Sequence, residues 1–299
     1  MNDEDGLIKI DFWGVRGSRT VTEPEIITGV GGYTSCVQVT IGDKIFVVDG
    51  GSGATNFGNW LFGELAKREE LTLHMLFTHK HIDHWCGLQF FGPLFASKKL
   101  TFEITGSEEN VEKFHKNVFD GDTFPVDVSM LAARVHYTPI ESGAVIVVPS
   151  TYRGQPENIV IEALSVNHPG GCLGYRFTFR GKSLAVIFDH EEVGPDAPEE
   201  LQQLERNLVE LLRGVDLGVI ECQYHEFEDE PKARYMKGWG HERVSHLIEV
   251  LKSAQVKEAI LTHHDPAANP ALVARIANAV HEGSGIPTTF ACERMSVVL

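Results

Sequence analysis

The stretch Thr78-His79-Lys80-His81-Ile82-Asp83-His84 places three imidazoles and one carboxylate within six residues, directly after the apolar run 75–77. Neutral imidazole and carboxylate are ligands that suit zinc, manganese and iron. A polar turn at the start of a helix needs only one capping side chain, for example Asp83, and not four. The stretch therefore predicts a strand that ends in a metal-binding turn.

The spacing within this stretch favours two metal ions. His79 and His81 can hold one metal together, because residues two apart in an extended or turning backbone point to the same side. Asp83 and His84 lie just beyond, at the expected start of a helix, and can face a second metal. Two metals need more ligands than these four, so the others must come from elsewhere in the chain.

Three later segments share one layout, an apolar strand that ends in a potential ligand. His168 follows the run 160–166, Asp189 follows the run 183–188, and His263 follows the run 258–262. Neighbouring strands that end at one rim of a sheet bring such groups together. We therefore expect one metal on His79, His81 and His168, a second on Asp83, His84 and His263, and Asp189 as a bridge between them.

Such a site predicts hydrolysis at phosphorus. Two cations roughly 3.5–4 Å apart share a water, lower its pKa and neutralise charge in an in-line displacement. Asp83 can also orient the resulting hydroxide. His241, in Gly238-Trp239-Gly240-His241, is the expected proton donor to the leaving alkoxide, although it could also cap the helix that follows. The predicted catalytic residues are therefore Asp83 and His241.

Strands and helices alternate along the chain without repeats. Strands are expected at 7–13, 36–41, 44–48, 74–78, 160–166, 174–179, 183–188, 217–221, 258–262 and 295–299, and helices at 57–68, 84–95, 108–117, 198–212, 242–254 and 270–281. Strand clusters in both halves, each followed by helices, predict an α/β fold of four layers, an αββα sandwich. No linker divides the chain, so 1–299 is expected to form one domain, with an irregular insertion at about 119–150.

The composition is that of a globular chain with a strongly acidic balance, with 42% hydrophobic residues, 23% charged residues and a formal net charge of −16. Such a surface repels a long nucleic acid, so a small anionic substrate fits better. Residues 1–5 are acidic without an apolar core, no long apolar run occurs, and the five cysteines are scattered. These features predict a cytoplasmic protein without a membrane span or a disulfide framework.

Several motifs resemble the metallo-β-lactamase superfamily. The His-x-His-x-Asp-His motif at 79–84 carries the resemblance, together with His168, Asp189, His263 and Asp49-Gly50-Gly51. The chain is more specifically similar to the phosphodiesterase branch that contains ribonuclease Z and the phosphoribosyl cyclic phosphodiesterases. This closer likeness covers Phe12-Trp13-Gly14-Val15-Arg16-Gly17-Ser18, Thr34-Ser35-Cys36, Asn167-His168-Pro169-Gly170-Gly171, Gly174-Tyr175-Arg176, Gly238-Trp239-Gly240-His241 and His263-His264-Asp265-Pro266.

The resemblance implies a metallo-β-lactamase-type sandwich with two divalent ions, zinc or manganese. In ribonuclease Z a histidine in a Gly-His or Ala-His segment before a helix contacts phosphate and assists the leaving group, and His241 has that place here. The chain departs from the branch at His190, where Thr often follows the bridging Asp, and at Glu221, where Asp is frequent. It also shows no inserted Gly/Pro-rich basic arm of the kind that ribonuclease Z uses to hold transfer RNA.

The expected substrate is therefore a small, cyclic nucleotide-like or sugar-phosphate diester. Three alternatives stay open at this point: an RNA 3′-end endonuclease, an ester or thioester hydrolase, and a nucleotide-binding protein without turnover. By analogy with relatives that are often dimers, a homodimer is one option. The choice between zinc and manganese and the roles of His190, His225, His264, Glu221 and Arg16 also stay open.

Overall fold

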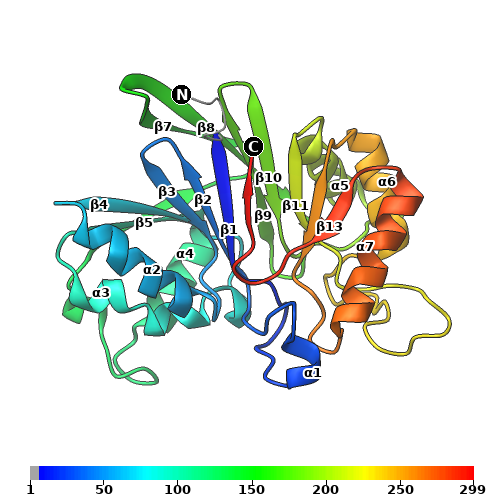
Figure 1. Ribbon diagram of the computed structural model, residues 1–299, viewed down its shortest axis with the longest axis horizontal. Coiled ribbons are helices and arrows are strands. Elements are labelled where there is room, and N and C mark those ends of the chain that lie inside the picture. Colours follow the sequence, from blue (N-terminus) through cyan, green and yellow to red (C-terminus); the bar gives the residue numbers. More distant parts are fainter. Residues whose placement is uncertain (1–6) are drawn as a thin grey trace.

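Two seven-stranded sheets lie face to face between two layers of helices in the structure, which is a computed structural model (Figure 1). It describes residues 7–299, apart from the side chains of residues 113–115 and 117, so the acidic stretch 1–5 lies outside the described residues. The first sheet contains, in spatial order, β14 (Ser296–Val298), β1 (Ile8–Gly14), β2 (Cys36–Ile41), β3 (Lys44–Val48), β4 (Leu71–Leu76), β5 (Leu100–Ser107) and β6 (Arg134–Ile140). The second contains β13 (Thr288–Phe290), β12 (Ala259–Thr262), β11 (Leu217–Glu221), β10 (Lys182–Ile187), β9 (Cys172–Phe179), β8 (Gln155–Val166) and β7 (Ala144–Tyr152).

Helices cover the outer face of each sheet. The first sheet carries α2 (Ala54–Ala66), α3 (Gly92–Ala96) and α4 (Glu108–Val118), and the second carries α5 (Glu199–Leu212), α6 (Val244–Ala254) and α7 (Pro270–Ser284). Short elements are α1 (Pro24–Ile27) and the 3₁₀ turns η1 (Ile82–His84), η2 (Cys86–Phe90) and η3 (Val128–Met130). The predicted αββα sandwich is confirmed. Among the described residues, no helix combines the length and apolar character needed to span a membrane.

The central core lies between the two sheets. Phe46 on β3 meets Phe177 on β9 edge to face, with ring centroids 5.5 Å apart, and both side chains are fully buried. Alternating strand residues supply this layer, because every second side chain points to the same face. The other face of each sheet packs on helices, as Leu247 and Leu251 of α6 do against the second sheet.

Parallel strands bring the future site residues to one rim. In the second sheet β10, β11 and β12 are parallel neighbours, and in the first sheet β3, β4 and β5 are parallel neighbours. Strands β10 and β11 have almost no exposed residue, which explains their continuous apolar sequences. Because such strands end at a common edge, the loops after β4, β8, β10, β11 and β12 can converge between the two sheets.

The prediction of an irregular insertion at 119–150 is wrong in its second half. Residues 134–140 form β6, which pairs in parallel with β5, and residues 144–152 form β7, which pairs antiparallel with β8. Each is the edge strand of its sheet. Pro139 and Pro149 made the segment look irregular, but an edge strand tolerates proline because one side of its hydrogen-bond ladder is free.

The prediction of one helix over 84–95 is also wrong. The segment is divided into η1, η2 and the short α3. A Cβ atom on Gly87 would lie 2.0 Å from the carbonyl oxygen of Gly51, so this glycine allows a close backbone approach rather than a helix interior. Helix α3 then begins at Gly92, with Pro93 in its first turn, where the missing N–H of proline costs no intrahelical hydrogen bond. Strands β5 and β13 were not predicted at all.

Candidate metal centre

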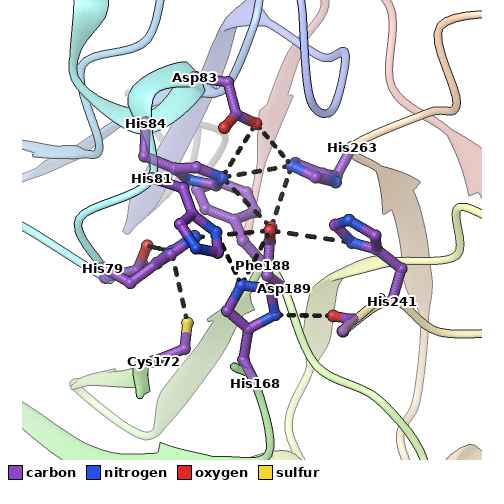
Figure 2. A network of polar contacts seen from close by, with 12 residues as sticks. His79, His81, Asp83, His84, His168, Cys172, Phe188, Asp189, His241 and His263 are labelled. Atoms are coloured by element: carbon purple, nitrogen blue, oxygen red, sulfur yellow. Dashed lines mark hydrogen bonds and ion pairs between the residues drawn. The ribbon is translucent and has the colours of Figure 1, made fainter. Parts of the chain in front are cut away.

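All seven predicted ligands meet at one rim between the sheets, where their side chains converge on Asp189 (Figure 2). His79 and His81 follow β4, and Asp83 and His84 lie in η1. The remaining three, His168, Asp189 and His263, follow β8, β10 and β12. The structure therefore brings together all the groups that the strand-end argument selected, while their role as metal ligands stays a prediction.

The first predicted trio lies around one oxygen of Asp189. Nε2 of His168 is 3.0 Å from Nδ1 of His81 and 3.7 Å from Oδ2 of Asp189. Nε2 of His79 lies 3.5 Å from the same Oδ2. One ligand atom from each of these four residues lies within 4.8 Å of the others, a spacing that a single cation could fill.

The second predicted trio lies around the other oxygen of Asp189. Nε2 of His263 is 3.0 Å from Oδ1 of Asp189, 3.3 Å from Nε2 of His84 and 3.4 Å from Oδ2 of Asp83. Nε2 of His84 is also 3.3 Å from Oδ1 of Asp189. The two carboxylate oxygens of Asp189 thus face different groups, which is the geometry expected of a bridging ligand.

The polar atoms of this cluster are buried without adequate partners, which supports cation binding. His79, His84, His263 and Asp189 are each at most 2% exposed. Nε2 of His79 has no hydrogen-bond partner among the described residues. Burial of an unpaired polar atom is costly, and a bound cation would satisfy it. The donor set therefore fits two divalent ions with nitrogen and oxygen ligands.

The protonation of the two groups differs. Burial lowers the pKa of His79, His81 and His168, so these rings are neutral and have lone pairs available for a metal. Burial also opposes the charging of His84 and His263, but nearby carboxylates outweigh it and raise the pKa of both rings well above the usual value. A cation bound between Asp83, His84 and His263 would therefore displace protons from the two rings, which the nearby carboxylates otherwise keep protonated.

Two hydrogen-bonding groups orient the ligands. The buried carboxylate of Asp49 accepts hydrogen bonds from the backbone N–H of Thr78 at 2.8 Å and from its hydroxyl at 2.6 Å, and Nδ1 of His84 lies 2.6 Å from it. The contact with Nδ1 leaves Nε2 of His84 facing the cluster. The backbone N–H of Ser18 donates to Oδ2 of Asp83 at 2.8 Å. Such supporting contacts hold metal ligands in place and raise their basicity.

Backbone strain gathers at the same place. Ser18, Asp49 and His263 have positive φ angles of 58°, 59° and 54°, although none of them is glycine. This left-handed region is sparsely populated by such residues and costs about 1–3 kcal/mol each. The surrounding contacts must therefore stabilise these conformations. Strain of this kind is typical of functional sites.

His241 lies beside the cluster and is paired with Glu221. Its Nδ1 is 3.1 Å from Oε2 of Glu221 and 3.8 Å from Oδ2 of Asp189. Burial opposes protonation of His241, but the carboxylates of Glu221 and Asp189 outweigh it and raise the pKa of the ring above the usual value. The predicted proton donor is therefore close to the predicted ligands and is favoured in its protonated form.

Glu221 is a site residue whose role the sequence left open. It is fully buried at the end of β11, and it accepts a hydrogen bond from the backbone N–H of His190 at 2.6 Å in addition to its contact with His241. Its Oε2 also lies 3.4 Å from Nδ1 of His263. The rule that selected Asp189 and His263, an apolar strand ending in a potential ligand, applies equally to 217–221 and could have found it.

The other residues whose roles the sequence left open make contacts that support the fold. His190 pairs through Nε2 with Glu242 at 2.7 Å, behind the cluster. His225 and His264 lie at hydrogen-bond distance from the backbone carbonyls of Lys232 and Ala291, at 2.7 and 3.0 Å. Arg16 is fully buried and donates to four backbone carbonyls, those of Ile26, Gly31, Asp265 and Ala268. Its guanidinium therefore fastens the loop after β12 rather than facing a ligand.

A four-layer sandwich with a buried histidine and carboxylate cluster at one rim defines the metallo-hydrolase fold of the metallo-β-lactamase type. Residues 66–264 match the beta-lactamase superfamily domain, and the chain belongs to this family. The predicted membership of the metallo-β-lactamase superfamily is thereby confirmed. No curated protein matches the sequence.

Solved structures share the fold over nearly the whole chain. Unliganded yeast PDE1 has a TM-score of 0.71 and 16% identity, with 98% of this chain and 100% of that chain covered. The metallo-beta-lactamase fold protein YhfI from Bacillus subtilis has a TM-score of 0.66 and 18% identity, with coverage of 97% and 98%. Zinc-bound PqqB from Methylobacterium extorquens has a TM-score of 0.63 and 17% identity, with coverage of 97% and 100%. At such identities the likeness shows the fold alone.

Proposed function

We propose that this protein is a metal-dependent phosphodiesterase that cleaves a small, cyclic nucleotide-like or sugar-phosphate diester. The observation that carries the proposal is the His241–Glu221 pair beside the predicted two-metal cluster. An ester or thioester has a different geometry at the reacting carbon, and a binding protein without turnover has no use for a positioned proton donor.

The predicted ligands define what each side chain contributes. His79, His81 and His168 would hold one divalent ion, Asp83, His84 and His263 would hold another, and Asp189 would contact both. When bound, the two ions would polarise the phosphoryl oxygens and make a nearby water acidic enough to ionise near neutral pH. The amide of Ser18 holds Oδ2 of Asp83, the oxygen that faces His84 and His263, so this carboxylate can orient the attacking water.

The leaving group needs a proton as the P–O bond breaks. Nδ1 of His241 is engaged by Glu221, so the transferred proton comes from Nε2 of the same ring. Glu221 stabilises the protonated ring before transfer and fixes the ring orientation. This step matters most for an alkoxide, a poor leaving group, and least for an acidic phenol.

The charge of the chain supports a small substrate. A net charge of −16 repels a polyanion, whereas bound cations attract a single phosphodiester locally. The proposal includes a cytoplasmic location. Its metal is zinc or manganese, because the ligand types suit both.

Steady-state hydrolysis of bis-p-nitrophenyl phosphate and of a panel of cyclic nucleotides, with Zn²⁺ or Mn²⁺, tests the proposal. We expect turnover that Asp83→Ala lowers by at least about 100-fold. The matched control is Asp122→Ala, which removes a carboxylate in an exposed loop and should behave as wild type. Equal, background-level rates in metal-loaded wild type and Asp83→Ala would refute phosphodiesterase activity.

A further inference from the structure

Glu191 is a buried carboxylate whose hydrogen bonds all go to one segment far along the chain. It is 7% exposed and lies two residues after Asp189. Its Oε1 accepts from the hydroxyl of Tyr235 at 2.9 Å and from the backbone N–H of Gly238 at 2.6 Å. Its Oε2 accepts from the backbone N–H of Gly240 at 2.9 Å. One carboxylate therefore fastens the segment 235–240 at three points.

The backbone of Glu191 is itself anchored beside the predicted ligands. Its N–H donates to the carbonyl of Asn167 at 2.8 Å, and its own carbonyl accepts from the side-chain amide of Asn167 at 2.8 Å. Asn167 directly precedes His168. The Glu191 carboxylate thus starts from a fixed position between the loops that supply Asp189 and His168.

Gly240 links the Glu191 carboxylate to two histidines, His168 and His241. Its N–H is held by Glu191, and its carbonyl accepts a hydrogen bond from Nδ1 of His168 at 2.8 Å. A proton on Nδ1 leaves the lone pair of His168 on Nε2, the atom that faces His81 and Asp189. The next residue is His241. Gly240 also packs so tightly that a Cβ atom would lie 2.4 Å from Nδ1 of His168.

We infer that Glu191 is a positioning residue that sets the orientation of both His168 and His241 by fastening the segment 235–240. The inference rests on the proposed function for its effect through His241, whereas its effect on metal binding through His168 is independent of substrate. Glu191 touches neither the reacting atoms nor the predicted ligand atoms, so its carboxylate acts through its donors in the segment 235–240 and reaches His168 through the peptide of Gly240.

The test compares Glu191→Gln with Glu192→Gln. The first replaces one acceptor oxygen by an N–H₂ group that faces a backbone N–H, while the second removes a neighbouring carboxylate that pairs with Arg243 outside the cluster. Zn²⁺ affinity, measured by competition with a chromophoric chelator, should fall about 10–100-fold in Glu191→Gln only. The rate with 2′,3′-cyclic AMP, which releases an alkoxide, should fall at least 10-fold more than the rate with bis-p-nitrophenyl phosphate.

These readouts separate positioning from a general structural effect. Wild-type Zn²⁺ affinity together with equal losses on both substrates in folded Glu191→Gln would overturn the inference. If that variant does not fold, Tyr235→Phe removes one of the three donors and should show smaller losses in the same directions, and wild-type values there would overturn the inference instead. If wild type hydrolyses neither substrate, the proposed function fails, while the Zn²⁺ measurement still decides the role of Glu191.

Discussion

The Glu221–His241 pair is the smallest unit that links this structure to a reaction. Metal-type ligands alone are compatible with storage, sensing or hydrolysis, but a histidine held by a buried carboxylate beside them is typical of a proton donor. Glu221 is fully buried, so its interaction with the ring is little screened by solvent. The pair therefore predicts a specific pH dependence.

A general acid works while it is protonated, so the rate with 2′,3′-cyclic AMP should fall as the pH rises through the pKa of His241. The carboxylates of Glu221 and Asp189 raise that pKa against the effect of burial. Glu221→Gln removes one of these charges, so the fall should move to lower pH, with kcat at pH 8 reduced about 10-fold or more. The measurement is kcat from pH 5 to 10 for the variant and wild type.

Glu258→Gln is the control for this profile, because Glu258 is exposed and outside the cluster. If kcat of Glu221→Gln falls at the same alkaline pH as kcat of wild type, His241 does not supply the proton.

At the scale of elements, the segment 235–241 contains a matched pair of glycines. Gly238 and Gly240 have nearly the same positive φ, 85° and 83°. A Cβ atom on Gly238 would meet no atom of the described residues within 4 Å, whereas one on Gly240 would collide with His168 and Pro169. Alanine therefore introduces similar backbone strain at both positions but displaces a predicted ligand at only one.

We expect Gly238→Ala to lose about 1–2 kcal/mol of stability and to keep its metal affinity. Gly240→Ala should lose a similar amount of stability and, in addition, at least about 10-fold in Zn²⁺ affinity. Urea unfolding of the metal-free proteins and chelator competition measure the two effects. Equal metal affinities in the two variants would contradict the role given to the contact between Gly240 and His168.

Helices α5 and α6 are joined behind the site by His246, which pairs with two carboxylates. His246 on α6 lies 3.0 Å from Glu205 on α5 and 2.7 Å from Glu242. Burial alone would lower the pKa of His246, but these two carboxylates outweigh it and raise the pKa from 6.5 to about 10. The folded protein thus binds this proton more tightly than the unfolded chain does. The resulting stabilisation is complete below about pH 6.5 and disappears as the pH rises through about 10.

His246→Gln should therefore lower the free energy of unfolding by about 3 kcal/mol at pH 6, and by clearly less at pH 10. Urea unfolding at both pH values measures the difference from wild type. His281→Gln, on the exposed face of α7, serves as the control and should change little at either pH. A loss for His246→Gln that is the same at pH 6 and pH 10 would show that the charge of His246 beside the two carboxylates is not the cause.

The same scale shows which parts of the architecture are readable from sequence. Buried strands and their polar ends are local patterns, so His79 to His84, His168, Asp189 and His263 could be selected before the fold was known. The edge strands β6 and β7 were not predicted, because their prolines and half-exposed residues lack a strong apolar signal. The role of Glu191 was not predicted for another reason: its partners lie 44 to 49 residues away, and no local pattern marks them.

At the scale of the whole molecule, charge decides which phosphodiesters can approach. A net charge of −16 opposes the counterion-driven binding on which proteins that hold long nucleic acids depend. We expect transfer RNA to bind more weakly than about 100 μM in 150 mM salt, as measured by fluorescence anisotropy. Tight binding that weakens steeply with added salt would instead favour the RNA 3′-end endonuclease.

The central claim is that Asp189 stands between two cations. The direct measurement is anomalous diffraction from crystals grown with Mn²⁺ or Zn²⁺. We predict two peaks about 3.5–4 Å apart, one contacted by His79, His81 and His168 and the other by Asp83, His84 and His263, with one oxygen of Asp189 on each. A single peak, or ions bound elsewhere with Asp189 contacting none, would contradict the account.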